Sequence, residues 1–533
     1  MKLSPSAHAD TFCRDNLPPA DQWPTLRFGL AELQYPERVN CATALLDEVA
    51  AAHGPDRPCL LTAGDSWTYG ELLTRANQTA HVLTEDLGLI PGQRVLLRGP
   101  NNPWLVASWF GVLKAGGVVV TTMPMLRSLE LAPLAELTRP ALAICDHRFT
   151  EELASAAPDL PLVPYGGTSD GDLIKRSAAK PGAFADVATA ADDVAMLAAT
   201  SGTTGTPKAT MHFHRDVLAI ADTFGKYLVQ SQPADVFTGT PPLAFTFGLG
   251  GLLVFPMRVG AATLLVEKAT PAELADAVER FGVTVVSTSP TAYRAMLRAG
   301  KADCLRGLRT AVSAGEHLPK SVWEDFFAQT GVRLVDGIGS TEMLHVFVAA
   351  TGDDIRPGST GRAVPGYQAD VLGPDGRPAA DGEMGHLAVI GPTGCRYLAD
   401  PRQAQYVRGG WNITGDTYIR DADGYLWYQG RSDDMIVSAG YNIAPAEIER
   451  VLELHPDVAE CAVVGRPDPD RGMIVHAAVV LAGGAAGDDQ KVTELQNFMK
   501  QRMAPYKYPR SVEFVAALPR TATGKVQRFR LRG

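Results

Sequence analysis

The sequence lacks the features that mark secreted and membrane-spanning proteins. Its 533 residues include 7 cysteines, but no two form a Cys-x-x-Cys pair, and an odd number does not suit a disulfide framework. The N-terminus has no basic region followed by an apolar stretch, so we expect no signal peptide. The most apolar windows, around 106–125 and 252–266, are interrupted by Lys114 and Arg258 and predict no membrane span. These absences predict a cytoplasmic protein with reduced thiols.

An excess of positive charge is also missing. The formal net charge is −10, which argues against general nucleic-acid binding. Hydrophobic residues make up 46% of the chain and charged residues 20%, as is ordinary for a globular enzyme. A chain of this length exceeds a single hydrophobic core, so we expect at least two domains. The oligomeric state stays open between a monomer and a homodimer.

Periodic patterns predict where these domains lie. Helical and strand patterns alternate from about residue 68 to 390, which predicts α/β layers with largely parallel sheets. Turn signals between short strand-like runs predict a β-rich subdomain over 368–430, and the pattern after 431–434 is that of a compact α+β domain. We therefore predict a large layered N-terminal α/β domain over 1–431 and a small mobile α+β C-terminal domain over 432–533.

Some individual elements can also be predicted. The patterns indicate helices over 68–87 and 103–114, and strands over 94–97 and 118–121. Pro319 stands where a proline in the first turn of a helix belongs.

A loop rich in hydroxyl and amide donors follows an apolar, strand-like segment at 194–199. The loop, Thr200–Lys208, reads Thr-Ser-Gly-Thr-Thr-Gly-Thr-Pro-Lys. Such a loop after a strand is typical of a polyphosphate cradle, although most loops of this composition are solvated turns. It is not a Walker A loop, because Lys208 is not followed by Ser or Thr and the glycine spacing differs.

The nine-residue string closely resembles the phosphate loop of the acyl-adenylate-forming ligases. This superfamily contains acyl-CoA synthetases, nonribosomal adenylation domains and beetle luciferases. The resemblance implies that the protein uses ATP, Mg²⁺ and CoA and that its small domain rotates between two half-reactions. It also implies that the nucleotide is bound by Thr200, Ser201, Gly202, Thr203, Thr204 and Lys208.

Two further strings match the superfamily's adenine and α-phosphate motifs. Asp336–Glu342, with the sequence Asp-Gly-Ile-Gly-Ser-Thr-Glu, follows a strand-like run, and ligands of open α/β sheets bind at that edge. By resemblance, adenine is contacted by Asp336, Gly337 and Ile338, and from the Ser313–Pro319 string by Ala314, Gly315 and Glu316. The second string could also be an ordinary strand-to-helix turn. Thr341 would bond the α-phosphate and Glu342 would help to hold Mg²⁺, although a charge at a helix N-terminus is the alternative for Glu342.

The remaining nucleotide motifs lie near the predicted domain boundary and the C-terminus. By resemblance, Asp416 and Arg431 hold the ribose hydroxyls, although such a pair could also be a structural salt bridge. Lys525, in the Leu518–Arg528 string, would bridge the carboxylate and the α-phosphate during adenylation and act with Thr341 and Glu342 as a catalytic residue.

The resemblance also assigns residues to the second half-reaction. The small domain would rotate about Asp433, so that the Ser438–Asn442 loop replaces Lys525 at the site. Gly440 and Tyr441 would then line the passage for the pantetheine arm. Many relatives carry Arg or Lys where this chain has Asn442.

The segment that opens the acyl pocket in this superfamily, Pro241–Gly251, contains no acid. An α-amino acid would need a carboxylate there, because an unpaired buried cation is costly. Phe245 and Phe247 instead offer flat apolar walls for a ring.

Strings over the whole chain look like the benzoate-CoA ligase branch, and most like 2-aminobenzoate-CoA ligases. They are Tyr35–Asn40, Asp336–His345, Trp411–Asp416, Ser438–Ile443 and Met503–Arg510. By resemblance the ring is lined by Phe245, Thr246, Phe247, Gly337, Val346 and Thr351. Some benzoate ligases have Tyr where Phe247 stands and His where Thr351 stands, which leaves the ring substituent open.

We therefore expect an AMP-forming aryl-CoA ligase for 2-aminobenzoate or benzoate. Two alternatives are a standalone adenylation enzyme that loads a carrier protein, and a non-catalytic nucleotide-binding regulator. Lys525 and Glu342 argue against the regulator.

Overall fold

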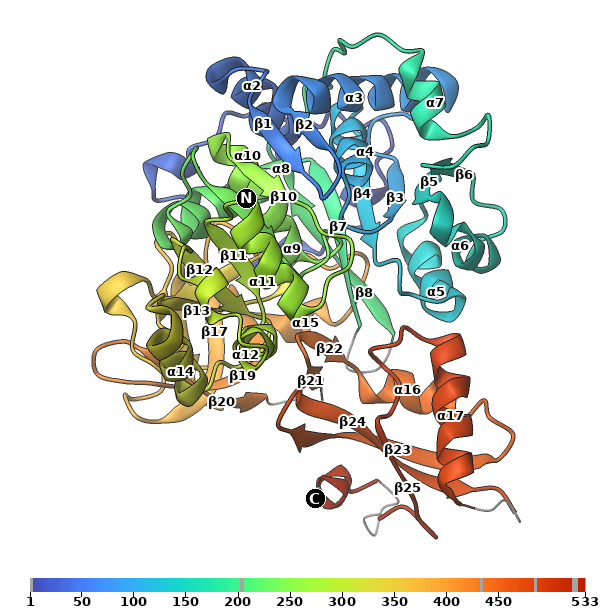
Figure 1. Cartoon of the computed structure of the whole chain (residues 1–533), viewed down its shortest axis with the longest axis vertical. Helices are drawn as coiled ribbons and strands as arrows, with labels where there is room; N and C mark the ends of the chain where they lie inside the picture. The colour runs from blue at the N-terminus through green and yellow to red at the C-terminus, as the bar shows by residue number, and fades with distance from the viewer. Residues whose placement is uncertain (1–2, 202–205, 432–434, 484–486, 520–525, 533) are drawn as a thin grey trace.

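The computed structural model describes residues 3–201, 206–431, 435–483, 487–519 and 526–532 (Figure 1). The part of the chain up to β20 forms a large α/β body, and the orange and red C-terminal part forms a smaller body beside it. This arrangement confirms the predicted fold class. The domain boundary at 431/432 stays a prediction; β20 ends at Arg431 and β21 begins at Ile436.

Two mainly parallel sheets form most of the large body. In spatial order, the strands of the first are β15 (Arg362–Ala363), β14 (Val346–Ala349), β13 (Leu334–Gly339), β12 (Thr310–Ala314), β11 (Val285–Thr288), β9 (Val236–Gly239), β10 (Ala262–Leu264), β1 (Pro58–Leu61) and β2 (Ser66–Thr68). Those of the second are β6 (Leu162–Tyr165), β5 (Leu142–Asp146), β3 (Arg94–Arg98), β4 (Val118–Thr122), β7 (Val194–Ser201) and β8 (Pro207–Phe213). The parallel pairs need crossover connections, which explains the alternating pattern of the sequence.

Helices cover these sheets and connect their strands. They are α1 (Phe12–Asp15), α2 (Glu48–His53), α3 (Tyr69–His81), α4 (Pro103–Lys114), α5 (Ser128–Thr138), α6 (Thr150–Ala156), α7 (Leu173–Ala178), α8 (His214–Ile220), α9 (Thr246–Leu249), α10 (Phe255–Val259), α11 (Pro271–Arg280), α12 (Pro290–Arg298), α13 (Ala302–Leu305), α14 (Lys320–Thr330) and α15 (Gln403–Tyr406). Among the described residues, no helix is both long enough and apolar enough to span a bilayer.

Local signals in the sequence explain several helix ends. The side chain of Thr68 caps α3 in a capping box with Glu71. Asn102 caps α4, and Pro103 is its first residue. Pro319 is the N-cap of α14 rather than a residue of its first turn, so that prediction was one position off.

The predicted β-rich segment forms an antiparallel sheet, and the small body adds two more sheets. The strands of the first are β16 (Gln368–Leu372), β17 (Met384–Ile390), β18 (Val407–Arg408), β19 (Trp411–Arg420) and β20 (Leu426–Arg431). The small body contains the pair β21 (Ile436–Ser438) and β22 (Tyr441–Ile443), the sheet of β23 (Val458–Asp468), β24 (Gly472–Leu481) and β25 (Ser511–Phe514), and helices α16 (Pro445–Leu452) and α17 (Asp489–Arg502).

Candidate active site

A cavity of about 1030 Å³ lies where the small body meets the large one. Most of the predicted site residues that the structure describes line it. They are Thr200, Lys208, Phe245, Thr246, Phe247, Ala314, Gly315, Thr341, Glu342, Val346, Asp416, Arg431, Gly440 and Tyr441. Residues more than 200 positions apart are thus brought to one place, as a shared binding site requires.

Five predicted residues are described but do not line this cavity. Gly337 packs against Val346, which lines the cavity, since a Cβ atom at Gly337 would lie 2.7 Å from Val346 Cγ1. Glu316 accepts a hydrogen bond from Thr291 at 2.7 Å. Asp336 faces a separate small hollow, and its Oδ1 atom has no hydrogen-bond partner among the described residues. Ile338 and Thr351 complete this group.

Other predicted residues lie outside the described residues. They are Gly202, Thr203, Thr204, Asp433 and Lys525. Ser201 ends β7, where only its backbone is described. The roles predicted for all of these residues stay predictions.

The two ends of the predicted phosphate loop are held by an antiparallel hairpin. Strands β7 and β8 pair so that Thr200 lies opposite Lys208. The guanidinium of Arg402 donates to the carbonyl oxygens of Thr206 at 3.1 Å and Pro207 at 3.3 Å, and it also pairs with Asp400. This clamp fixes the strand that leaves the loop and aims Lys208 at the cavity.

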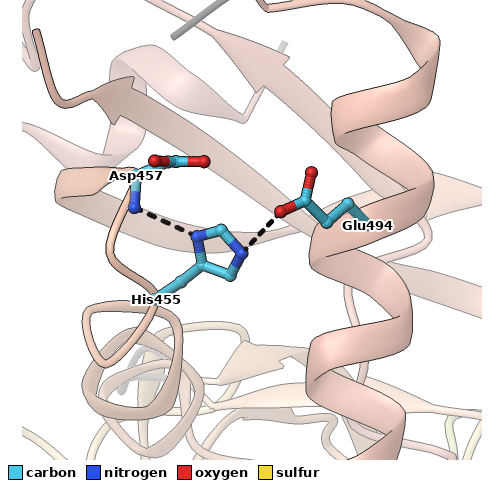
Figure 2. Close-up of side chains that lie close together, drawn as sticks. All are labelled: His455, Asp457 and Glu494. Carbon is cyan, nitrogen blue, oxygen red and sulfur yellow. Dashed lines mark hydrogen bonds and ion pairs between the residues drawn. The ribbon is translucent and has the colours of Figure 1, made fainter.

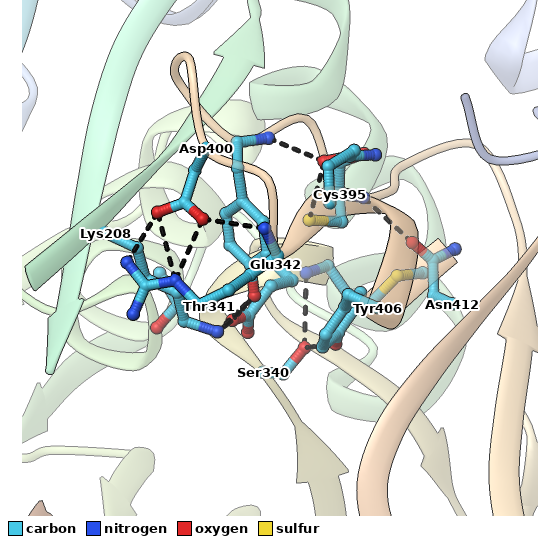
Figure 3. A network of polar contacts seen from close by, with 12 residues as sticks. Lys208, Ser340, Thr341, Glu342, Cys395, Asp400, Tyr406 and Asn412 are labelled. Atoms are coloured by element: carbon cyan, nitrogen blue, oxygen red, sulfur yellow. Dashed lines mark hydrogen bonds and ion pairs between the residues drawn. The ribbon is translucent and has the colours of Figure 1, made fainter. Parts of the chain in front are cut away.

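Glu342 is the centre of a polar network beside this hairpin (Figure 3). Its Oε1 atom lies 2.9 Å from Lys208 Nζ and accepts a hydrogen bond from Tyr397 at 2.5 Å. Burial alone would raise the pKa of Glu342, but the charge of Lys208 and these hydrogen bonds outweigh it and lower the pKa. The carboxylate is therefore ionised at neutral pH. Tyr397 had no signal in the sequence, because only the fold brings it here.

The predicted ribose pair is also brought together. Asp416 on β19 lies opposite Arg431 on β20, and Arg431 Nη1 donates to Asp416 Oδ1 at 3.2 Å. Both side chains line the cavity. The pair is therefore placed to meet vicinal hydroxyls, since a carboxylate accepts two hydrogen bonds.

The tip of the β21–β22 hairpin reaches the cavity from the small body. Ser438 pairs with Tyr441, so Ala439 and Gly440 form a two-residue turn, and both have positive φ angles of 49° and 83°. These angles are typical of a type I′ turn, where glycine is favoured and alanine is strained. The tip packs against the other wall, because a side chain at Gly315 would lie 3.6 Å from the Cα atom of Gly440.

A buried ion network, which was not predicted from the sequence, also joins the two bodies. Lys507 Nζ lies 2.5 Å from Glu130 of α5 and 2.6 Å from Glu447 of α16. Glu130 uses its second oxygen to accept from the backbone N–H groups of Ala504 and Arg127, at 2.8 Å and 2.9 Å. Burial would lower the pKa of Lys507, but its neighbours raise it above the ordinary value. The lysine is therefore charged and shared between the bodies.

Every acid that lines the cavity in the described part of the chain already has a cation beside it. Glu130 and Glu447 share Lys507, Glu342 faces Lys208, and Asp416 faces Arg431. The wall formed by Phe245, Thr246, Phe247 and Val346 contributes no charge. The cavity therefore offers an apolar surface to a ring and no free carboxylate to an α-ammonium group.

A second cluster of ligand-type side chains lies in the small body (Figure 2). His455 Nε2 lies 3.1 Å from Glu494, and His455 Nδ1 accepts from the backbone N–H of Asp457 at 3.2 Å. Lys491 lies 2.6 Å from each of the two carboxylates. The Lys491 ammonium neutralises the two carboxylates in place of a metal ion, so the cluster is an ion-pair network. The described residues contain no other group of three such ligands close enough for a metal.

An enzyme that joins an acid first to AMP and then to a thiol must bring a nucleotide, an acid and the thiol to one point. The cavity is lined by Thr200 and Lys208 of the β7–β8 hairpin, by the Asp416–Arg431 pair, by an uncharged wall and by the Ala439–Gly440 tip. An AMP-forming acid–thiol ligase requires such a combination of groups at one place.

The chain is a member of the AMP-binding enzyme family. The family pattern "AMP-binding enzyme" matches residues 46–397, and "AMP-binding enzyme C-terminal domain" matches residues 447–525. The resemblance seen in the sequence is thereby confirmed at the level of the family.

Several relatives are similar over nearly their whole length. A benzoate–CoA ligase of Thauera aromatica is 34% identical, with 94% of this chain and 97% of the relative covered. A 3-hydroxybenzoate–CoA ligase of Aromatoleum sp. (strain CIB) is 32% identical, with 93% and 96% covered. The crystal structure of the anthranilate CoA ligase AuaEII in complex with anthranoyl-AMP superposes with a TM-score of 0.73 at 32% identity, with 94% and 98% covered.

Proposed function

We propose that the protein activates an aryl carboxylic acid, 2-aminobenzoate or benzoate, with ATP and then transfers the acyl group to CoA. The observation that carries this proposal is the uncharged wall of Phe245, Phe247 and Val346 in a cavity where each acid of the described residues is paired with a cation. A neutral ring can pack there, whereas a charged amine would lose its hydration without recovering it. The similarity to benzoate-, 3-hydroxybenzoate- and anthranilate-CoA ligases supports the same substrate class.

In the first half-reaction a carboxylate oxygen attacks the α-phosphorus of ATP, and pyrophosphate leaves with the bonding electrons. In this proposal, donors surround the phosphates. Thr200 and Lys208 donate from the hairpin, Thr341 donates to the α-phosphate, and Lys525 lies at the attacking oxygen. Fixed donors of this kind stabilise charge that develops in the transition state. Asp416 and Arg431 hold the ribose, so the adenylate stays in place after pyrophosphate has left.

The residues present also fit a magnesium ion. Glu342 is an ionised carboxylate on the cavity wall, and Mg²⁺ is commonly held by one or two carboxylates together with substrate phosphates. When bound, the ion would neutralise part of the phosphate charge. Lys208 Nζ now lies 2.9 Å from Glu342 Oε1, and in this proposal it would turn to the phosphates when the ion is bound.

In the second half-reaction the thiol attacks the acyl carbonyl carbon, and AMP leaves. The position of the Ala439–Gly440 tip in the cavity supports the proposal that the small domain has the orientation for this step. A tip without long side chains leaves room for a pantetheine arm. Rotation of the small domain about Asp433 would bring Lys525 in for adenylation.

The test is a product analysis with purified protein, ATP, Mg²⁺ and CoA. We expect AMP, pyrophosphate and an aryl-CoA thioester from benzoate or 2-aminobenzoate, and little turnover of phenylalanine or octanoate. ADP and phosphate as products would contradict adenylation. A thioester formed on a pantetheinylated carrier protein but not on CoA would contradict the proposed acceptor alone.

A further inference from the structure

His212 is a fully buried histidine that the proposed function has not used. It lies near the end of β8, and successive side chains of a strand point to opposite faces of the sheet. One face of β8 packs into an apolar cluster through Ala209, Met211 and Phe213. His212 is therefore on the other face, which it shares with Lys208 of the phosphate hairpin.

The imidazole of His212 is bonded to the turn that carries Thr341 and Glu342. Its Nε2 atom donates to the carbonyl oxygen of Thr341 at 2.8 Å, across 129 positions of the sequence. A carbonyl oxygen can only accept, so the ring carries a proton on Nε2. Burial, helped by the nearby charge of Arg396, lowers the pKa of His212 to about 3. The ring is therefore neutral, and its one N–H is the group that holds Thr341.

The turn itself is short and strained. Thr341–Met343 forms a single 3₁₀ turn, and Leu344 after it has a φ angle of 69°, which is costly for a residue with a side chain. Contacts from other segments hold each residue of the turn. His212 binds the first, and the next two accept hydrogen bonds from Tyr397 at 2.5 Å and from Thr393 at 2.8 Å. The position of the turn is therefore set from outside it.

Strand β8 is a firm support for this contact, because it is bonded along both edges. It pairs with β7 on one edge, and backbone hydrogen bonds join it to residues 396–398 on the other. The same strand supplies Lys208, whose Nζ lies 2.9 Å from Glu342. A single strand thus fixes both the backbone of Thr341 and the cation beside Glu342.

We propose that His212 is a positioning residue for adenylation, which fixes the backbone of Thr341 so that the Thr341 hydroxyl and the Glu342 carboxylate keep their places at the phosphates. The inference rests on the proposed function and deepens it, because it adds a residue that does not touch the substrate. Without the imidazole, only the backbone N–H of Leu344, at 3.2 Å, still donates to the Thr341 carbonyl among the described residues. The turn can then shift, and a displacement of about 1 Å can cost about 10²-fold in rate.

The test varies the reach of the side chain at position 212. Pyrophosphate release is measured with the aryl acid that the wild-type protein uses best. His212→Leu should lower kcat by roughly 10- to 100-fold and change KM for the acid by no more than about threefold, because the ring wall is untouched. His212→Gln can place an amide N–H near the position of Nε2 and should recover much of kcat. His212→Asn is equally polar but too short to reach Thr341, so equal rates in the Gln and Asn variants would overturn the proposal.

The second half-reaction gives an independent readout. Thioester formation from synthetic aryl-AMP and CoA involves no attack at the α-phosphorus, so His212→Leu should slow it by no more than about threefold. A general folding defect would lower both half-reactions. Equal losses in the two would therefore overturn the proposal.

His214 provides the matched control. It is as fully buried as His212, but β8 has ended and α8 begins there, so its Nδ1 atom accepts from the backbone N–H of Cys41 at 3.1 Å instead. His214→Leu should lower the melting temperature and leave kcat within about twofold of the wild-type value. A loss of kcat as large as that of His212→Leu would overturn the proposal. A wild-type protein that releases no pyrophosphate with any acid would instead refute the proposed function.

Discussion

Replacing Glu130 by Gln should impair thioester formation and spare adenylation. Both oxygens of Glu130 act as acceptors, one from Lys507 and the other from two backbone N–H groups. An isosteric amide has only one acceptor atom, so its NH₂ group must face a donor. A hydrogen bond to a charged group contributes about 1.5–3 kcal/mol. In the orientation seen here the contact joins the two bodies, and under the proposed rotation it would be lost in the other orientation.

The magnitude follows from that loss. Each 1.4 kcal/mol corresponds to about tenfold in an equilibrium constant, so the population of this orientation should fall by roughly 10- to 100-fold. Lys507 keeps Glu447 as its partner, so the small domain itself should remain folded. Thioester formation from synthetic aryl-AMP and CoA should fall by a similar factor, whereas pyrophosphate release in the absence of CoA should stay within about twofold.

A control variant and a comparison of the two half-reactions test this prediction. The control variant is Glu152→Gln, because Glu152 lies in the same region of the large body and its partners among the described residues are Arg127 and Ser128 rather than Lys507. It should leave both half-reactions unchanged. If Glu130→Gln slows both half-reactions equally, or neither, the network does not set the orientation and the reasoning is refuted.

Three further predictions concern the two half-reactions and the ring wall. Lys525→Ala should slow adenylation by about 10²-fold or more, with thioester formation from synthetic aryl-AMP largely retained; equal losses in rapid-quench assays would contradict the alternation. Gly440→Leu should block thioester formation but not pyrophosphate exchange. Gly440→Ala is the control, because it adds the same backbone strain at a φ angle of 83° but little bulk, and it should reduce thioester formation less. Phe247→Ala should lower kcat/KM for benzoate by at least about tenfold, because one wall of the pocket is lost. It should also raise kcat/KM for octanoate relative to that for benzoate. An unchanged ratio of the two values would show that Phe247 is not part of the pocket.

The fold was predictable because its signals are local. Strand and helix periods, the caps of α3 and α4, and the turn residues of the β-rich segment all lie within a few positions of the elements that they define. Asp416 and Arg431 were predicted as ribose contacts through resemblance to known ligases; the structure pairs them across β19 and β20, and their role at the ribose stays a prediction. The predicted position of Pro319 was wrong by one residue, because a proline fits both the N-cap and the first turn of a helix.

The site residues that could not be predicted from the sequence depend on contacts between distant segments. Tyr397 lies 55 positions from Glu342, and Lys507 lies 377 positions from Glu130. No periodicity connects such pairs, since their meeting depends on sheet order and on the placement of the small domain.

The two-residue turn at Ala439 and Gly440 has a consequence for how quickly the small domain can leave. The tip itself meets the large body through backbone and a single methyl group, and beside it the ring of Tyr441 packs edge-on against Phe245, with centroids 5.9 Å apart. Separation at this point therefore breaks one aromatic contact and does not require a core to unpack. The rate of departure should be governed by the contacts on either side, Lys507 with Glu130 and the ion pair of Arg298 with Asp470. Because both are ionic, added salt is expected to speed the exchange of domain orientations, and most strongly through the more exposed pair.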